Sequence, residues 1–227
     1  MRRGRRLVTI LVFLVSVLVM LNAALLVLTI RPAPEPTGGA VFSGGTVGFT
    51  YISGALCFVP ISRGWTLVSL CMNTTQTSIP VLMQNVDYRF VMAWNTTSQD
   101  FVIYSPLAAD PPFTDMQFNT SYFIYLNNPS NTQFGLNGKE VEDLNISLVS
   151  GWNAPGFPYV FNSTILKYFN ESRHRYLMKW NTSAQEFVIY SPRAATPAFT
   201  TINRSEGQML NSYVNTSLYY NKSYLQG

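Results

Sequence analysis

The distribution of hydrophobic and polar residues divides the chain into two different parts. From Leu7 to Ile30 the chain runs for twenty-four residues without a charge, directly after the basic sequence MRRGRR. At about 1.5 Å per residue, a helix of this length crosses the roughly 30 Å hydrocarbon core of a membrane. It is longer than the apolar region of a cleaved secretory signal, which has about 7–15 residues. We therefore expect residues 7–30 to form a retained transmembrane signal-anchor, with residues 1–6 in the cytoplasm and the rest outside.

Beyond residue 30 hydrophobic and polar residues alternate, as they do in half-buried strands. The alternation places two sets of hydrophobic residues on matching strand faces: Tyr88, Phe90, Met92 and Trp94, and then Tyr176, Met178 and Trp180. The loops NTTSQD and NTSAQE follow these strands, and each leads into FVIYSP, so each segment predicts a β-hairpin. Only STILKYFNE is a candidate for a short helix or turn. The pattern predicts an all-β ectodomain.

The two hairpin segments belong to an internal duplication. Residues 94–114 and 180–200 are identical at fifteen of twenty-one positions without a gap, and Trp65 and Trp152 extend the match upstream. We expect two tandem, similar β-sandwich or barrel-like domains at residues 55–128 and 144–227, joined by a linker at 129–143. In the first copy NTSYFIYLN supplies an aromatic closing strand. The aromatic sequence from Asn215 fits this strand best if about ten residues are inserted after Asn203 in the second copy.

Residues 31–54 lie between the predicted anchor and the first repeat. Three alternating prolines, Pro32, Pro34 and Pro36, favour a stiff polyproline-II spacer. The following segment, Ala40–Ser53, has strand-like alternation interrupted by glycines. If each domain is self-contained, which we favour, this segment is a linker or a strand paired within its own chain. The alternative is that it is donated to a neighbouring copy.

Glycosylation sequons are unusually frequent after residue 30. Composition alone predicts about three N-x-[ST] sequences there. The chain has ten, at Asn73, Asn95, Asn119, Asn145, Asn162, Asn170, Asn181, Asn203, Asn215 and Asn221. Their number favours a glycosylated protein of the cell exterior, although an Asn- and Thr-rich β-protein with turn asparagines would also contain many of them.

The two cysteines agree with an exterior location. Cys57 and Cys71 flank one predicted hairpin and lack the spacing and histidine partners of a metal site. In an oxidising compartment they would form a disulfide. Two buried free thiols are the alternative.

The sequences around the tryptophans resemble a known type of module. ISRGWTLVSL, followed by a WN-F-Y-P pattern, PF and SYFIYL, is similar to small β-domains with a Gly-Trp-Asn-Leu-Ile/Val-Ser-Leu-Pro motif in archaeal and some bacterial surface proteins. The resemblance covers most of residues 55–225 and implies a structural module of an exported chain, without catalytic residues. The chain departs from the motif at Thr66, at Cys71 and after Asn153.

Charge and candidate chemistry exclude several function classes. After residue 30 eleven basic residues face eleven acidic ones, so no basic surface favours nucleic acid. A single histidine, His174, cannot make a triad or a multi-histidine metal site, and we expect it in an exposed turn or strand. The acidic group Glu140, Glu142 and Asp143 lacks the spacing of a calcium loop. The four tryptophans could stack on carbohydrate, but core packing explains their equivalent positions better.

We therefore expect no enzyme, no catalytic or metal-ligating residues and no cofactor. The sequence is typical of a membrane-anchored surface glycoprotein with a structural or adhesive role. Its expected partners are the membrane, through residues 7–30, and copies of itself or other envelope proteins. The alternative is a subunit of an extracellular filament or pilus, either pilin-like or assembled by a donated strand.

Overall fold

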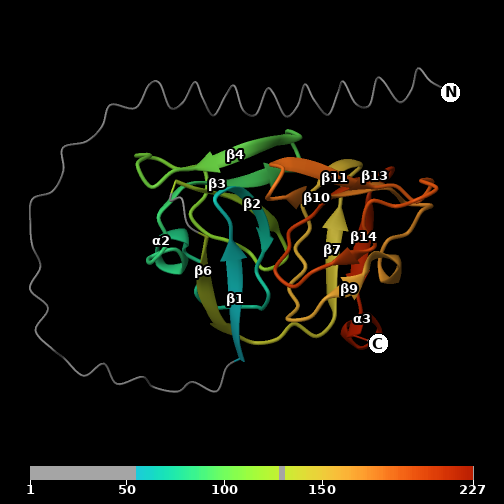
Figure 1. Ribbon diagram of the computed structural model, residues 1–227, viewed down its shortest axis with the longest axis horizontal. Helices are drawn as coiled ribbons and strands as arrows, with labels where there is room; N and C mark the ends of the chain where they lie inside the picture. Colours follow the sequence, from blue (N-terminus) through green and yellow to red (C-terminus); the bar gives the residue numbers. More distant parts are fainter. Residues whose placement is uncertain (1–54, 128–130, 227) are drawn as a thin grey trace, which may run out of the picture. The chain divides into compact units, whose positions relative to one another are not determined.

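The structure, a computed structural model, describes residues 55–127 and 131–226, and this part of the chain is mostly β-sheet with a few short helices (Figure 1). The all-β class is therefore confirmed. The expected cytoplasmic tip, transmembrane segment and spacer at residues 1–54 lie outside the described residues. Within the described residues, no helix is both long and apolar enough to cross a membrane.

The first repeat forms a four-stranded sheet and a two-stranded sheet. Its elements are β1 (Ala55–Ile61), β2 (Gly64–Ser69), α2 (Ile79–Leu82), β3 (Tyr88–Asn95), β4 (Asp100–Tyr104), β5 (Ser121–Leu126) and β6 (Thr132–Gly138). The larger sheet has the order β2-β5-β3-β4, and β1 pairs with β6. All these pairs are antiparallel, and the predicted hairpin is confirmed as β3–β4. Strand β6 lies inside the expected linker at 129–143, so the first repeat extends beyond its predicted end.

The second repeat has the same two sheets and a further two-stranded sheet. Its elements are β7 (Leu144–Leu148), β8 (Gly151–Asn153), β9 (Ser163–Thr164), η1 (Ile165–Lys167), β10 (His174–Asn181), β11 (Glu186–Tyr190), β12 (Thr201–Ile202), β13 (Met209–Ser212), β14 (Thr216–Tyr220) and α3 (Lys222–Gln226). The sheet β8-β13-β10-β11 corresponds to β2-β5-β3-β4, the pair β7–β14 corresponds to β1–β6, and the further sheet is β9–β12. The second predicted hairpin is β10–β11, and STILKYFNE contains the short helix η1.

The inserted residues expected in the second repeat are not there. Val91 of β3 pairs with Ile124 of β5, and Leu177 of β10 pairs with Leu210 of β13, so both closing strands lie at the same distance along the chain. The sequence QMLNS therefore contains the closing strand, and the aromatic sequence after Asn215 forms β14. The prediction failed because aromatic residues occupy different strands in the two cores: Tyr220 of β14 is fully buried.

Each repeat has its own hydrophobic core beneath its four-stranded sheet. The first is mainly aliphatic and includes Ile61, Leu70, Ile79, Ile124 and Leu136. The second is richer in aromatic residues and includes Phe157, Tyr159, Tyr168, Leu177 and Tyr220. Gln208 lies within the second core, where it accepts a hydrogen bond from Tyr168 and donates one to Tyr220. These bonds satisfy polar groups that would be costly to bury alone.

A bulge at the start of each central strand changes the predicted faces. The register of β3 shifts between Tyr88 and Phe90, and that of β10 shifts between His174 and Tyr176. Tyr88 therefore packs against the first core instead of sharing the face of Phe90. A bulge inserts one unpaired residue, which sends the residues before it to the opposite face.

Candidate functional site: the repeat interface and the glycosylation acceptors

The tip of each hairpin binds the backbone of the other repeat. Gln99, in the β3–β4 turn, accepts a hydrogen bond from the Trp152 amide at 2.8 Å and donates one to the Trp152 carbonyl at 3.0 Å. Gln185, in the β10–β11 turn, makes the same two bonds with Trp65, at 2.8 and 3.1 Å. Each side-chain amide thus pairs with an edge strand as a neighbouring strand would.

The indoles of the hairpin strands complete these contacts. Trp94 Nε1 donates to the Trp152 carbonyl, and Trp180 Nε1 donates to the Trp65 carbonyl, both at 2.8 Å. In each set, one tryptophan and one glutamine make three hydrogen bonds to the Gly-Trp backbone of the other repeat. We call each set a Gln–Trp clasp. The two clasps are equivalent under the duplication.

The glycines before Trp65 and Trp152 make room for the clasps. Gly64 and Gly151 have φ angles of +77° and +101°. A Cβ atom at Gly64 would lie 2.7 Å from Gln185 Oε1, and one at Gly151 would lie 2.6 Å from Gln99 Oε1. The Gly-Trp sequence is therefore required both by backbone conformation and by the close approach of the glutamine.

Backbone hydrogen bonds extend the repeat interface beyond the clasps. Ser69 N donates to Ser205 O and Gly207 N donates to Leu67 O. The equivalent pair is Gly156 N to Asn119 O and Ser121 N to Ala154 O. The outer edges of β2 and of the β8 segment are therefore each covered by the opposite repeat, which removes two exposed sheet edges.

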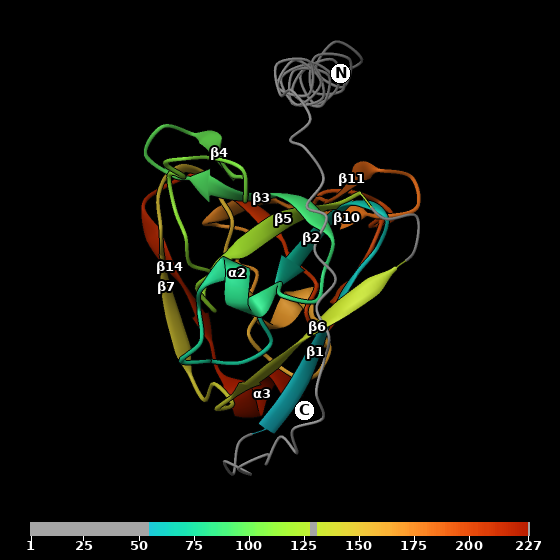
Figure 2. The same cartoon turned by 90° about the vertical axis from the view of Figure 1, so that its left-hand side faces the viewer.

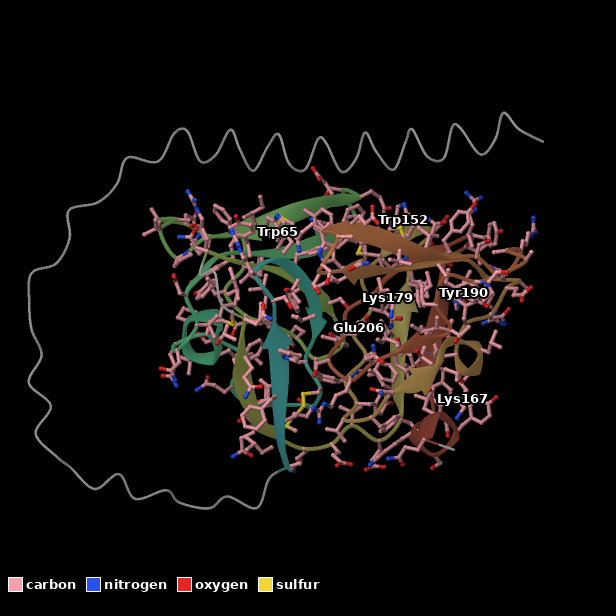
Figure 3. All side chains as sticks on the ribbon, viewed as in Figure 1. Trp65, Trp152, Lys167, Lys179, Tyr190 and Glu206 are labelled. Carbon is pink, nitrogen blue, oxygen red and sulfur yellow. A yellow bond between two sulfur atoms is a disulfide. The ribbon has the colours of Figure 1, made fainter. Side chains whose placement is uncertain are left out.

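Aromatic side chains pack between the two four-stranded sheets. Phe123 lies with its ring 5.1 Å from that of Trp180 and 5.7 Å from that of Phe187, both in edge-to-face geometry. Figure 3 labels Trp65 and Trp152 in the upper part of the molecule, where the hairpins meet. Trp65 is buried and the other three tryptophans are half-buried. Core packing was the better interpretation, but the packing joins the repeats instead of serving each core separately.

Sequence reasoning missed the two glutamines. A signal was present, because Gln99 and Gln185 are identical in the two copies while the residues beside them, Ser98 and Ala184, differ. Their partners lie 53 and 120 residues away in the sequence, so the pattern could not identify what they bind.

The disulfide between Cys57 and Cys71 is confirmed. The hairpin that the cysteines were expected to flank is not present, because β1 pairs with β6 and β2 pairs with β5. The disulfide joins β1 to the segment that follows β2. Its Cα atoms are 6.4 Å apart, across a separation of fourteen residues.

All ten sequon asparagines lie in the described residues, and none is buried. Asn95 and Asn221 are half-buried and the other eight are exposed. Asn95 and Asn181 lie at equivalent hairpin turns, where each Oδ1 accepts two backbone amides. The carbohydrate is attached through the side-chain nitrogen, so these turns are compatible with a glycan. By contrast Asn153, which is not in a sequon, is buried and donates through Nδ2 to Val149 O and Gly151 O.

His174 is buried, with 2% of its surface exposed, and not in an exposed position as expected. The bulge in β10 turns it into the second core, where its Nδ1 accepts the Asn170 amide at 3.1 Å and its ring contacts Phe169. Within the described residues its Nε2 has no hydrogen-bond partner. Burial, with the Arg173 charge nearby, lowers the pKa of His174 from 6.5 to about 4.

The candidate acidic group is occupied by a lysine. Lys222 Nζ lies 2.9 Å from both Glu140 and Glu142, and these carboxylates raise the pKa of Lys222. Asp143 accepts the Tyr219 hydroxyl and the Lys222 amide. Across residues 55–127 and 131–226 no group of three or more His, Cys, Asp or Glu side chains is placed to hold a metal ion.

Comparisons of the chain with protein-family models, with curated proteins and with solved structures return no match.

Proposed function

We propose that this chain is a membrane-anchored, N-glycosylated protein of the cell surface, with a structural or adhesive role in the envelope. The Gly-Trp modules that it resembles favour an archaeal origin. The observation that carries the proposal is the placement of the sequons, because ten asparagines from both repeats all avoid the interior. The disulfide supports it, since such bonds persist in oxidising compartments. The uncharged segment 7–30 would supply the anchor.

The proposal treats the duplicated β-structure as a rigid unit and not as a pair of flexible modules. The repeat interface holds the two sheets together through hydrogen bonds at both hairpin tips. Rigidity of this kind suits a protein that presents or spaces other components at a surface. No catalytic side-chain arrangement enters the proposal.

Mass spectrometry of intact glycopeptides from protein isolated from native membranes tests the proposal. We expect glycans on Asn95 and Asn181 and on most of the other sequons, and an N-terminus that retains residues 7–30. Protein made in a cytoplasm without N-glycosylation provides the unmodified control. If both hairpin asparagines are unmodified in native material, the proposal is wrong. A mature N-terminus between Ala23 and Gly39 would contradict the anchor alone.

A second candidate function is a subunit of an extracellular filament. The observation that favours it is a sheet edge in the first repeat that no other described strand covers. Strands at open edges pair readily with extended segments of other chains.

A further inference from the structure

Strand β6 has one edge that no other described strand covers. Among residues 55–127 and 131–226, β6 pairs with β1 along one edge. On the opposite edge a single β-bridge forms, between Lys139, just beyond the strand, and Asn73. Lys139 exchanges two backbone hydrogen bonds with Asn73, at 3.0 and 2.8 Å. Because backbone groups alternate between the two edges of a strand, Gln133, Gly135 and Asn137 present their amides and carbonyls to the same side as Lys139.

The outer edge of β1, on the other side of the β1–β6 pair, agrees with this orientation of the backbone groups. Pro60, which has no amide hydrogen, lies opposite Gln133, so it removes no bond from the β1–β6 ladder. The carbonyl of Phe58 accepts the Ser205 hydroxyl from the second repeat at 3.4 Å. The outer edge of β1 is therefore contacted by the second repeat, and the outer edge of β6 is the open one.

A groove runs between this open edge and α2. It has a volume of about 280 Å³ and is walled on one side by Gln133–Asn137. The other wall combines three apolar residues with four polar ones: Val81, Leu82, Val86, Thr74, Gln76, Gln84 and Asn85. Figure 2, together with Figure 1, shows α2 beside β6. Val81 keeps 41% of its surface exposed at this wall. The groove thus combines backbone groups that pair with no other described strand with a wall of apolar and polar side chains, and an extended strand is recognised by such backbone groups together with side-chain pockets.

The duplication provides an internal comparison. In the second repeat the corresponding strand β14 is followed by α3, whose Leu225 is buried and whose Leu225 carbonyl accepts bonds from Ser163 and Lys167 beside η1. Sequons lie on both sides of β14, at Asn215 and Asn221. The second repeat therefore places its own chain, and predicted glycans, near this position, whereas no described segment of the first repeat occupies it.

The outer faces of the two-stranded sheets differ in the same way. In the first repeat Leu56 and Phe58 keep 63% and 42% of their surface exposed. The pairing registers place Asp143 and the sequon residue Asn145 at the corresponding positions of the second repeat. The edge strands β4 and β11 also have open edges in the described chain, but each follows a hairpin turn with a sequon, at Asn95 or Asn181.

We propose that the β6–α2 groove binds the segment Ala40–Ser53 of a second copy of this chain as an added strand. The segment contains no charge and alternates Val47, Phe49 and Tyr51 with smaller residues, which suits an uncharged groove whose wall includes Val81, Leu82 and Val86. The inference rests on the exterior location proposed above and deepens the filament candidate.

A second copy fits better than the same chain. A strand on the open edge of β6 would lie two strand spacings from β1, about 10 Å. Within one chain at least three residues, at about 3.5 Å each, would have to cross this distance before Ala55, so the added strand would have to end at or before about Ile52. The chain would also have to pass the Asn73–Lys139 bridge, which closes that end of the groove. A segment from another copy meets neither restriction.

Disulfide cross-linking between two differently tagged full-length copies tests the inference. One copy carries Gln133→Cys, and the other carries a cysteine scanned singly through positions 46–51. The matched control is Ser217→Cys, because Ser217 on β14 corresponds to Gln133 in register. Both variants are compared in protein made without glycans, because Ser217 completes the Asn215 sequon. We expect Gln133→Cys to give a cross-linked hetero-dimer at one or two of the scanned positions, two residues apart because alternate side chains of a strand share a face. The yield of hetero-dimer with Ser217→Cys should be several-fold lower. Asn137→Cys repeats the test if Gln133→Cys does not fold.

Three results would overturn the inference. They are equal cross-linking to both repeats, no cross-link at any position, and a cross-link that forms only inside a single chain that carries both cysteines. The experiment is independent of the glycan analysis. If the native protein carries no glycans while the hetero-dimer still forms, the proposed surface glycoprotein is refuted and the strand exchange is retained.

Discussion

At the scale of single residues, His174 shows how one position can make the second repeat sensitive to acid. It corresponds to Tyr88 of the first repeat, and the bulge places both side chains on the core side of their strands. Tyrosine stays neutral there throughout the acid range, whereas histidine can take up a proton. The neutral imidazole is retained because its surroundings penalise the charge.

We predict that the protein loses stability as the pH falls from 6.5 toward 4. The pKa of His174 is about 4 in the folded chain and near 6.5 when unfolded, so the unfolded chain binds the proton first. The free energy of unfolding should therefore fall across this window, by up to about 3 kcal/mol, and change no further from this group below pH 4. Urea unfolding at half-unit pH steps measures the effect.

His174→Asn is the matched variant for this prediction, because its Oδ1 can still accept the Asn170 amide without titrating. His174 is the only histidine in the chain. The slope between pH 5 and 6.5 should therefore disappear in the variant. An unchanged slope would show that other groups cause it.

At the scale of secondary-structure elements, the hairpins were predictable and their purpose was not. The alternation of residues 88–94 and the turn sequence identify β3 and β4 because both signals are local. The clasps are contacts between residues far apart in the sequence, and no local pattern specifies them. The closing strand of the second repeat was misplaced for a related reason: burial in β13 is achieved by Met209 and Leu210, so the aromatic residues of the first copy were a misleading guide.

The same limits apply to β6 and to the disulfide. The sequence around Asn131 is rich in turn formers, which concealed a strand whose buried residues are only Phe134 and Leu136. The disulfide could be predicted from the number of cysteines and the expected compartment. Its place in the fold could not, because β1 and β2 pair with strands that are distant in the sequence.

We predict that Gln185→Glu destabilises the chain by about 1–3 kcal/mol, because a carboxylate cannot donate to the Trp65 carbonyl or the Thr182 carbonyl. Gln99→Glu should cost less, because Gln99 is exposed and Gln185 is half-buried. Denaturant unfolding followed by tryptophan fluorescence measures both. Gln84→Glu, at an exposed position, is the control and should stay near the unchanged protein. A Gln185→Glu variant that unfolds like this control would show that the clasp contributes nothing to stability.

At the scale of the whole molecule, the repeats complete each other. Each closes its own core, yet each also covers an edge strand and a Gly-Trp backbone of the other. The expectation of two self-contained modules therefore describes the topology of each repeat, but it does not describe how the two repeats pack together. The duplicated sequence is used in the same way in both copies, because the hairpin of each repeat binds the Gly-Trp backbone of the other.

The last prediction follows from this mutual arrangement. If a protease site is inserted after Glu140 in the full-length protein, cleavage should leave the two halves associated in native buffer, because the clasps, the four backbone bonds and the aromatic contacts all cross the cut. The disulfide lies within the first half, so no covalent bond would hold the fragments together.

Size-exclusion chromatography before and after cleavage tests this prediction, and denaturant should separate the halves. Adding Gln99→Glu and Gln185→Glu should lower the denaturant concentration at which they separate. Halves that part as soon as the chain is cut would mean that the repeats are independent domains, and that the repeat interface depends on the covalent connection.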